Sequence, residues 1–247
     1  MKATILTDTE LRAHFFRTGS TTYPLPAGCI LTPAARDFIK ERGITLLSGP
    51  KGMSMSPVPL RGGKPVYVKA ESGEELSEKP EELTHLHGNV LVPKTHPRIA
   101  LRGRLDALQA EIILLQSLSP CPALTRDLGE VLAFCRAILG AEVKEEPLSP
   151  ISLLGMDSGQ LRRASHHTQE VFGIPHPIPS YEMGELAARL NLLRTQVREA
   201  ELSAARAFPA GERKDLIEGL NRLSSAIYIL FCRKVSGWYE QQGGDGP

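Results

Sequence analysis

The chain has 247 residues, enough for one sizeable core and a smaller module. Its 29 basic and 28 acidic side chains leave a formal net charge of +1, so no general field recruits nucleic acid or an anionic membrane. The four cysteines form no zinc-ligand cluster, and no apolar run is long enough to span a bilayer. We therefore expect a reduced, cytoplasmic, globular protein without nucleic-acid or membrane partners.

Residues 1–50 predict a small N-terminal α/β module. Thr32 and Pro33 have the character of a helix N-cap and first position, and this helix should end near Gly43. Short apolar runs on either side of it favour strands. From about residue 48 to residue 82 the sequence is rich in Gly, Pro, Ser, Lys and Glu and shows no helical period, although residues 65–68 could pair briefly as a strand. We therefore expect residues 51–94 to form a linker or extended arm.

Residues 95–238 predict an up-and-down bundle of four to five helices, and the fold class is therefore mainly α. Apolar residues recur at helical spacing in this region. The expected helices are two segments between Pro97 and Gly140 and three more at about 158–167, 180–208 and 212–236. The stretch 174–179 holds three prolines and must be a shaped loop, and residues 239–247 predict a disordered tail.

Charged and amide side chains stand beside the apolar seam of the last two expected helices. Arg194, Arg198 and Glu201 follow at i, i+4 and i+7, so they share one helix face that should be partly buried. Asn221 and Ser225 stand mid-helix among strong apolar positions, although Asn and Ser are mediocre helix formers. Because arginine matches phosphate oxygens bidentately, these helices together predict a small anion site suited to a polyphosphate and its nucleoside.

A solvated helix face explains the same spacing. Arginine and glutamate three or four residues apart often pair in water, and a mid-helix Asn often bonds a neighbouring carbonyl. Spacing alone favours this second interpretation, and both stay open at this level.

The residues in these segments resemble the two signature helices of ATP:corrinoid adenosyltransferases of the ethanolamine-utilisation type, and those of the wider propanediol-utilisation type. The matching segments are 190–201 and 220–225. Residues 94–106 resemble a segment of the wider family in which a lysine precedes Pro-Arg and a Gly-x-x-Asp follows. Shorter matches at 31–36, 84–86 and 165–166 extend the resemblance over nearly the whole chain.

The resemblance implies a homo-oligomeric helical bundle with ATP at subunit interfaces. It implies a reaction in which cob(I)alamin attacks C5′ of ATP and expels triphosphate, with Mg²⁺ accompanying the nucleotide. The product, adenosylcobalamin, would serve ethanolamine ammonia-lyase, and a flavoprotein reductase would deliver the electron. The setting would be the cytoplasm or the inside of a bacterial microcompartment.

Matched positions imply residue roles. Arg198 would hold the phosphates, Asn221 would orient ATP, and Arg194 would pair with Asp106. Glu201 would brace the arginines or the metal-bound nucleotide. Further contacts with the nucleotide are expected from Lys94, Arg98 and Ser225, and contacts with the corrin from Phe172, His176 and Ile178.

The sequence departs from the family pattern in places that bear on the site. Some ethanolamine-type members carry a His followed by a Cys-Cys-x-x-Cys metal motif, whereas residues 48–84 here contain no cysteine, so no transition-metal site is expected. The wider family has another arginine where Leu202 stands and an Asp where Ser225 stands. Its Gly-rich nucleotide loop has no clear counterpart, because residues 17–22 resemble it only superficially.

Two functions of other classes compete with catalysis. Leu202, in place of the arginine of the wider family, would suit a non-catalytic corrinoid or nucleotide carrier. Such a carrier would bind its ligands without releasing triphosphate. The compact N-terminal module would suit a scaffold protein of a microcompartment, and deletion of residues 1–50 would separate docking from activity.

Overall fold

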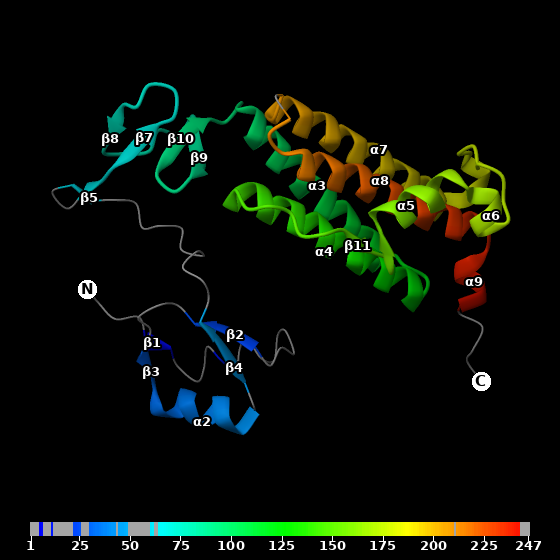
Figure 1. Cartoon of the computed structure of the whole chain (residues 1–247), viewed down its shortest axis with the longest axis horizontal. Coiled ribbons are helices and arrows are strands. Elements are labelled where there is room, and N and C mark those ends of the chain that lie inside the picture. The colour runs from blue at the N-terminus through cyan, green and yellow to red at the C-terminus, as the bar shows by residue number, and fades with distance from the viewer. Residues whose placement is uncertain are drawn as a thin grey trace. The chain divides into compact units, whose positions relative to one another are not determined.

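The computed structural model describes residues 5–6, 11, 22–25, 30–42, 44–48, 60–61, 64–209 and 211–242. The chain divides into two compact units, Met1–Val58 and Pro59–Pro247 (Figure 1). No helix in the described ranges combines the length and apolar character needed to cross a membrane.

Among the described residues of the first unit are the helix α2 and four short strands. Strand β1 (Ile5–Leu6) pairs in parallel with β3 (Ile30–Leu31), and β2 (Thr22–Leu25) pairs in parallel with β4 (Thr45–Ser48). Helix α2 (Pro33–Arg42) begins where the Thr32 hydroxyl accepts a hydrogen bond of 3.2 Å from the Ala35 amide. Leu11, Ala35, Phe38 and Ile44 form its buried core. The helix and flanking strands predicted for this module are present.

The second unit begins with short strands where the sequence predicts a linker. Strands β5 (Leu60–Arg61) and β6 (Lys64–Pro65) pair with each other, and four more strands form a sheet in the order β8-β7-β10-β9. These four are β7 (Tyr67–Lys69), β8 (Glu75–Leu76), β9 (Leu83–His87) and β10 (Val90–Pro93). Buried Leu83, Leu91 and Val92 give the sheet its apolar contacts. The sequence predicts a linker instead of these strands because short strands joined by Gly- and Pro-rich turns have the composition of a linker.

Four long helices form the bundle, and the mainly α fold class is confirmed. Helix α3 (Pro97–Ser117) packs on α4 (Pro122–Lys144) and on α7 (Gly184–Ala207), and α8 (Lys214–Val235) packs on α4 and α7 (Figure 1). Shorter elements join the two pairs of long helices. They are β11 (Ser152–Leu153), β12 (Met156–Asp157), α5 (Ser158–His166), α6 (Thr168–Phe172) and the 3-10 turn η1 (Tyr181–Met183).

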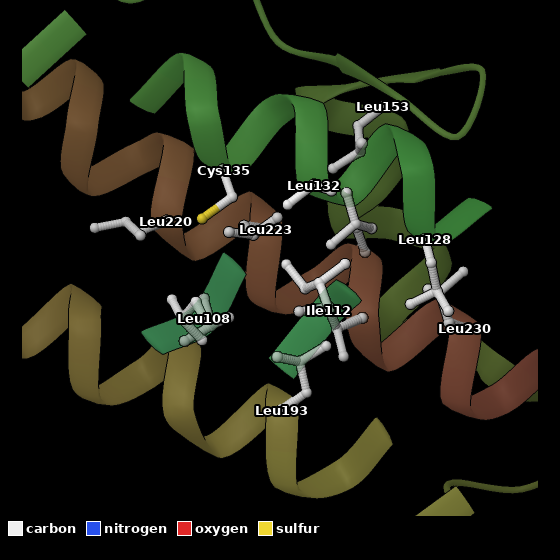
Figure 2. Close-up of a cluster of buried hydrophobic side chains, with 14 of the residues drawn as sticks. Leu108, Ile112, Leu128, Leu132, Cys135, Leu153, Leu193, Leu220, Leu223 and Leu230 are labelled. Carbon is white, nitrogen blue, oxygen red and sulfur yellow. The ribbon is translucent and has the colours of Figure 1, made fainter. Parts of the chain in front are cut away.

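The core lies where the apolar stripes of these helices meet (Figure 2). Leu108 and Ile112 of α3, Leu193 of α7, and Leu220 and Leu223 of α8 are at most 1% exposed. Each fully buried leucine or isoleucine contributes about 1.5–3 kcal/mol relative to an exposed one. The inward positions predicted from helical spacing are buried, except that Leu186 is only half-buried.

The C-terminal tail corrects the sequence prediction, because residues 239–242 are not a disordered extension. They belong to a short helix, α9 (Trp238–Gln242), in which Tyr239 is 3% exposed. The Tyr239 hydroxyl donates to Asp127 Oδ2 at 2.8 Å, and Arg233 Nη1 donates to the same oxygen at 2.7 Å. The Arg233 guanidinium lies 4.7 Å from the Trp238 ring centroid. These contacts hold the segment on α4 and α8, and residues 243–247 lie outside the described residues.

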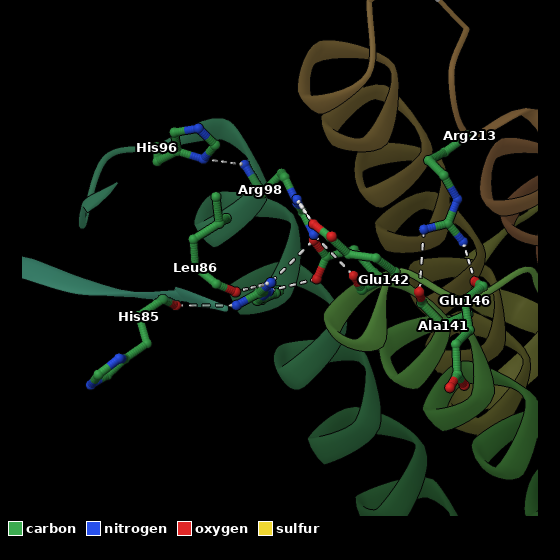
Figure 3. A network of polar contacts seen from close by, with 10 residues as sticks. His85, Leu86, His96, Arg98, Ala141, Glu142, Glu146 and Arg213 are labelled. Atoms are coloured by element: carbon green, nitrogen blue, oxygen red, sulfur yellow. Dashed lines mark hydrogen bonds and ion pairs between the residues drawn. The ribbon is translucent and has the colours of Figure 1, made fainter. Parts of the chain in front are cut away.

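A buried carboxylate joins the four-stranded sheet to the bundle (Figure 3). Glu142, near the end of α4, is 0% exposed and accepts hydrogen bonds from Arg98 Nε and Arg102 Nε, both at 2.5 Å. Arg102 also donates to the carbonyl oxygens of His85 and Leu86 in β9, at 3.3 and 2.8 Å. The start of α3, the end of α4 and β9 therefore share one charge network.

We predict that Glu142→Gln lowers the free energy of unfolding by about 3 kcal/mol, because two guanidinium groups then lose the buried charge that compensates them. Glu145→Gln is the matched control, since Glu145 accepts from Arg98 Nη1 at 2.6 Å but its side chain is 50% exposed. The control should cost less than about 1 kcal/mol. Urea unfolding measures both values, and equal losses would contradict the central role of Glu142.

A second ion pair fixes the chain between α4 and α8. Asp215 accepts from the Leu148 amide at 2.9 Å, and Arg213 donates to both of its carboxylate oxygens. Arg213 also donates to the carbonyl oxygens of Ala141 and Glu146 (Figure 3). The hydrogen bonds from Arg213 lower the pKa of Asp215 to about 2.

Because the pKa of Asp215 is lower in the folded than in the unfolded chain, its ionised form stabilises the fold above the unfolded pKa of about 3.9. This contribution of about 2 kcal/mol is lost as the pH falls from about 4 to about 2. The difference in unfolding free energy between wild type and Asp215→Asn should therefore shrink on acidification. Urea titrations at about pH 6, 4 and 3 test this, and a difference independent of pH would contradict it.

Candidate functional site

Six polar side chains line the seam between α7 and α8, and we call them the polar stripe. Those on α7 are Arg194, Arg198 and Glu201, and those on α8 are Asn221, Ser225 and Tyr228. Both sets have the spacing i, i+4, i+7, which places each set along one helix face. Because the helices run antiparallel, Glu201 meets Asn221 at one end and Arg194 meets Tyr228 at the other. Seven residues of helix separate the two ends by about 10 Å.

The amide of Asn221 is held in one orientation. Its Nδ2 donates to Glu201 Oε1 at 3.1 Å, and its Oδ1 accepts from Arg222 Nη1 at 2.6 Å. Arg222 Nε in turn donates to Ser158 Oγ at 2.9 Å, and this hydroxyl donates to Glu218 Oε1 at 2.6 Å. Sequence reasoning missed Arg222 and Ser158. The position of Arg222 next to Asn221 was an available signal, whereas Ser158 lies 64 residues away.

The other end of the polar stripe is built around Arg194. Its Nε and Nη2 donate to Asn191 Oδ1 at 3.2 and 3.0 Å, and its guanidinium lies 5.9 Å from the Tyr228 ring centroid. Asn191 and Tyr228 were not predicted, although Asn191 lies three residues before Arg194 and Tyr228 seven after Asn221. The side chain of Arg194 is half-buried. Its contacts leave it without a carboxylate partner inside the part of the chain that the structure describes.

The centre of the polar stripe offers a cation. The sequence predicts a partly buried face for both arginines, but Arg198 is exposed in the single chain. It makes no hydrogen bond or ion pair with the other described residues. Ser225 donates to the carbonyl oxygen of Asn221 at 3.3 Å, so its hydroxyl is tied to its own helix. Arg198 is thus the stripe residue best placed to receive an anion.

The predicted contacts on and before α3 lie apart from the polar stripe within one chain. Lys94 forms an exposed ion pair of 2.8 Å with Glu81, which lowers the pKa of that carboxyl. Arg98 is bound to Glu142 and Glu145, as described above. Asp106 is exposed, and its Oδ1 lies 3.5 Å from Gln109 Nε2. No hydrogen bond or ion pair among the described residues joins Lys94, Arg98 or Asp106 to the polar stripe.

The residues expected to face the corrin lie near the Tyr228 end of the polar stripe. Phe172 is half-buried against the bundle core, whereas the Ile178 side chain is 84% exposed. His176 uses both ring nitrogens: Nδ1 lies 3.0 Å from the Tyr228 hydroxyl and Nε2 lies 3.1 Å from the His166 carbonyl oxygen. His176 and His166 also line a surface cavity with His167.

The polar stripe suits a ligand in which an anionic group is attached to an uncharged polar group. Arg198, at the centre of the stripe, supplies a positive charge facing solvent. The fixed amide of Asn221 lies at one end of the stripe. Within the described ranges, no three His, Cys, Asp or Glu side chains lie close enough together to hold a metal ion. The expectation of no transition-metal site stays a prediction.

Two family models match the chain. Residues 76–234 match the cobalamin adenosyltransferase model, and residues 5–47 match the model of the corrinoid adenosyltransferase EutT N-terminal domain. The corrinoid adenosyltransferase EutT of Salmonella typhimurium is 31% identical, over 94% of this chain and 92% of its own length. The protein of the same name from Escherichia coli is 30% identical over the same shares.

The fold has a solved counterpart. A PduO-type ATP:corrinoid adenosyltransferase from Lactobacillus reuteri, complexed with cobalamin and ATP, matches with a TM-score of 0.52 and 20% identity. The match covers 65% of this chain and 91% of that chain. Both parts of the chain thus match models of one kind, and its relatives align with it almost from end to end. The chain belongs to the cobalamin adenosyltransferase family and, within it, to the EutT-like corrinoid adenosyltransferases.

Proposed function

We propose that this chain transfers the 5′-deoxyadenosyl group of ATP to cob(I)alamin and releases triphosphate and adenosylcobalamin. The observation that carries the proposal is the polar stripe, in which Arg198, without an ion pair to any described residue, stands on the same seam as the fixed amide of Asn221. Family membership supports the same reaction.

The reaction needs positioning and positive charge more than it needs proton transfer. The electron pair of the cobalt forms the Co–C5′ bond, the C5′–O bond breaks, and triphosphate leaves with the electrons of that bond. A metal-centred anion attacks carbon, so no general base is required. Fixed cations near the leaving group stabilise the charge that develops on it, which is the part we assign to Arg198.

The geometry supports roles for the other residues expected to contact the nucleotide. Asn221 would orient the nucleoside, since Glu201 and Arg222 prevent its amide from turning. Mg²⁺ is usually bound by one or two carboxylates together with substrate phosphates, and Glu201 fits this part. Lys94 would leave its exposed pair with Glu81 to join the phosphates. Arg98, committed to two carboxylates, would act by holding the start of α3.

The corrin would lie against the segment that follows α6. Phe172 and Ile178 supply apolar surface there, and the ring of His176 has no free nitrogen to offer as a ligand to cobalt. An apolar face of this kind suits a corrinoid whose lower ligand has been removed, which eases reduction to the cob(I) state.

We infer a homo-oligomer with sites shared between subunits. Within one chain Asp106 is exposed, and the partners of Arg194 among the described residues, Asn191 and Tyr228, are neutral. A neighbour's Asp106 would complete the pair with Arg194. Exposed Leu192 and Leu202 give α7 an apolar surface suited to such contact. The proposal also includes Mg²⁺ with the nucleotide, a flavoprotein reductase as electron donor and ethanolamine ammonia-lyase as the enzyme that receives the product. The setting would be the cytoplasm or a bacterial microcompartment.

A non-catalytic corrinoid or nucleotide carrier is the second candidate. It is favoured by Leu202, which is 53% exposed where the wider family has a further arginine. An anaerobic assay with reduced cobalamin and ATP discriminates the two, because a carrier binds both and releases no triphosphate. Deletion of residues 1–50 tests a scaffold role. If the deletion abolishes assembly while activity in the same assay is retained, that module serves docking.

Arg198→Ala should lower turnover about a hundredfold, because loss of a fixed charge at the leaving group costs about 3 kcal/mol of transition-state stabilisation. Visible absorbance of cob(I)alamin under anaerobic conditions follows the reaction. Arg206→Ala is the matched control, since Arg206 is an exposed arginine in the last turn of the same helix. Near-normal turnover of Arg198→Ala, with the control also active, would remove Arg198 from the phosphate site.

Mixing two inactive variants tests the shared site. If Asp106 of one subunit and Arg198 of its neighbour serve the same site, mixed oligomers of Asp106→Ala and Arg198→Ala contain some sites with both lesions and others with none. We expect the mixture to regain activity after co-refolding or subunit exchange, measured with the same absorbance assay. Mixtures that stay inactive, although native mass spectrometry detects mixed oligomers, would place each site within one subunit.

A further inference from the structure

Tyr228 touches both halves of the candidate site. Its hydroxyl lies 3.0 Å from His176 Nδ1, and the two rings stack with centroids 6.2 Å apart and an interplanar angle of 18°. The guanidinium of Arg194 lies 5.9 Å from the centroid of the Tyr228 ring. One half-buried tyrosine therefore stands between the segment assigned to the corrin and the end of the polar stripe.

The hydrogen-bond partners define the direction of each bond. A carbonyl oxygen only accepts, so His176 Nε2 must donate its hydrogen to the His166 carbonyl. In a neutral imidazole Nδ1 is then the acceptor, and the Tyr228 hydroxyl donates to it. Burial raises the pKa of Tyr228 to about 12, so the hydroxyl keeps the proton that it donates at neutral pH.

The segment 174–179 is attached by few hydrogen bonds, while Ile174 at its start packs against the bundle core. Pro175, Pro177 and Pro179 have no backbone N–H, so half of its residues cannot donate a main-chain hydrogen bond. Among the described residues, the side-chain hydrogen bonds of this segment are the two made by His176. Ile178, 84% exposed, stands two residues further on. His176 is therefore the hydrogen-bonded side chain of this segment that lies nearest in sequence to Ile178.

We propose that Tyr228 is a positioning residue that serves both substrates: its hydroxyl anchors the 174–179 segment through His176, and its ring supports the guanidinium of Arg194. This inference rests on the proposed function. It separates two parts of one side chain, because the hydroxyl acts toward the corrin side and the ring toward the nucleotide side. A purely structural tyrosine would show no such separation.

Substitution can remove the two parts of Tyr228 one at a time. Tyr228→Phe keeps the ring and loses the hydroxyl, so the KM for cob(I)alamin should rise about two- to tenfold, the effect of losing one hydrogen bond, while the KM for ATP stays unchanged. Tyr228→Leu loses the ring as well and should raise both values. Tyr67→Phe is the matched control, since the Tyr67 hydroxyl makes no hydrogen bond with the described residues. A Tyr228→Phe variant with both values unchanged, or with both raised equally, would overturn the inference.

A spectroscopic measurement tests the anchor without any turnover. In ¹⁵N NMR of the full chain, wild-type His176 should show a protonated Nε2 and an Nδ1 that accepts a hydrogen bond, with the signals assigned by loss in His176→Asn. In Tyr228→Phe the Nδ1 signal should move toward that of an imidazole nitrogen without a donor, and in Tyr67→Phe it should not move. An unmoved signal in Tyr228→Phe would refute the anchor. If the signal moves in Tyr228→Phe but the wild-type chain fails to adenosylate cobalamin, the proposed function is refuted and the anchor stands.

Discussion

The antiparallel register between α7 and α8 is the constraint on which the candidate site depends. In this register Glu201 of α7 contacts Asn221 of α8. Seven residues away on each helix, Arg194 contacts Tyr228. Buried apolar residues between them, such as Leu193 and Leu223, hold this register through close packing. A shift of one turn in either helix would separate the polar partners while leaving both helices intact. The chemistry of the seam is thus fixed by the core beneath it.

Helical parts of the fold could be predicted because local spacing records which face is buried. Leu101, Leu105 and Leu108 recur with the helical period, and each is buried in the structure. The sheet at residues 67–93 and the short helix α9 could not be found in this way. Their elements are two to five residues long, and their burial depends on contacts distant in sequence, such as that of Tyr239 with Asp127, 112 residues away.

The candidate site divides along the same line. The face shared by Arg194, Arg198 and Glu201 follows from helix geometry alone, and so does the mid-helix position of Asn221. What spacing cannot reveal is which charges neutralise one another across the fold. Arg98 stands next to a family motif, yet its guanidinium is bound to Glu142, 44 residues further along the chain. The division of labour between binding a ligand and holding the fold becomes visible only when the partners are located.

The hydrogen bonds from Arg102 to the sheet affect which substitutions the sheet can tolerate. This arginine holds β9 through the carbonyl oxygens of His85 and Leu86, which are groups that every residue type carries. Substitution at those two positions therefore leaves the acceptors of Arg102 in place, whereas substitution of Glu142 removes the carboxylate that orients the arginine. The surface near Lys94 can in this way be retuned by substitution in β9 while its attachment to the bundle persists.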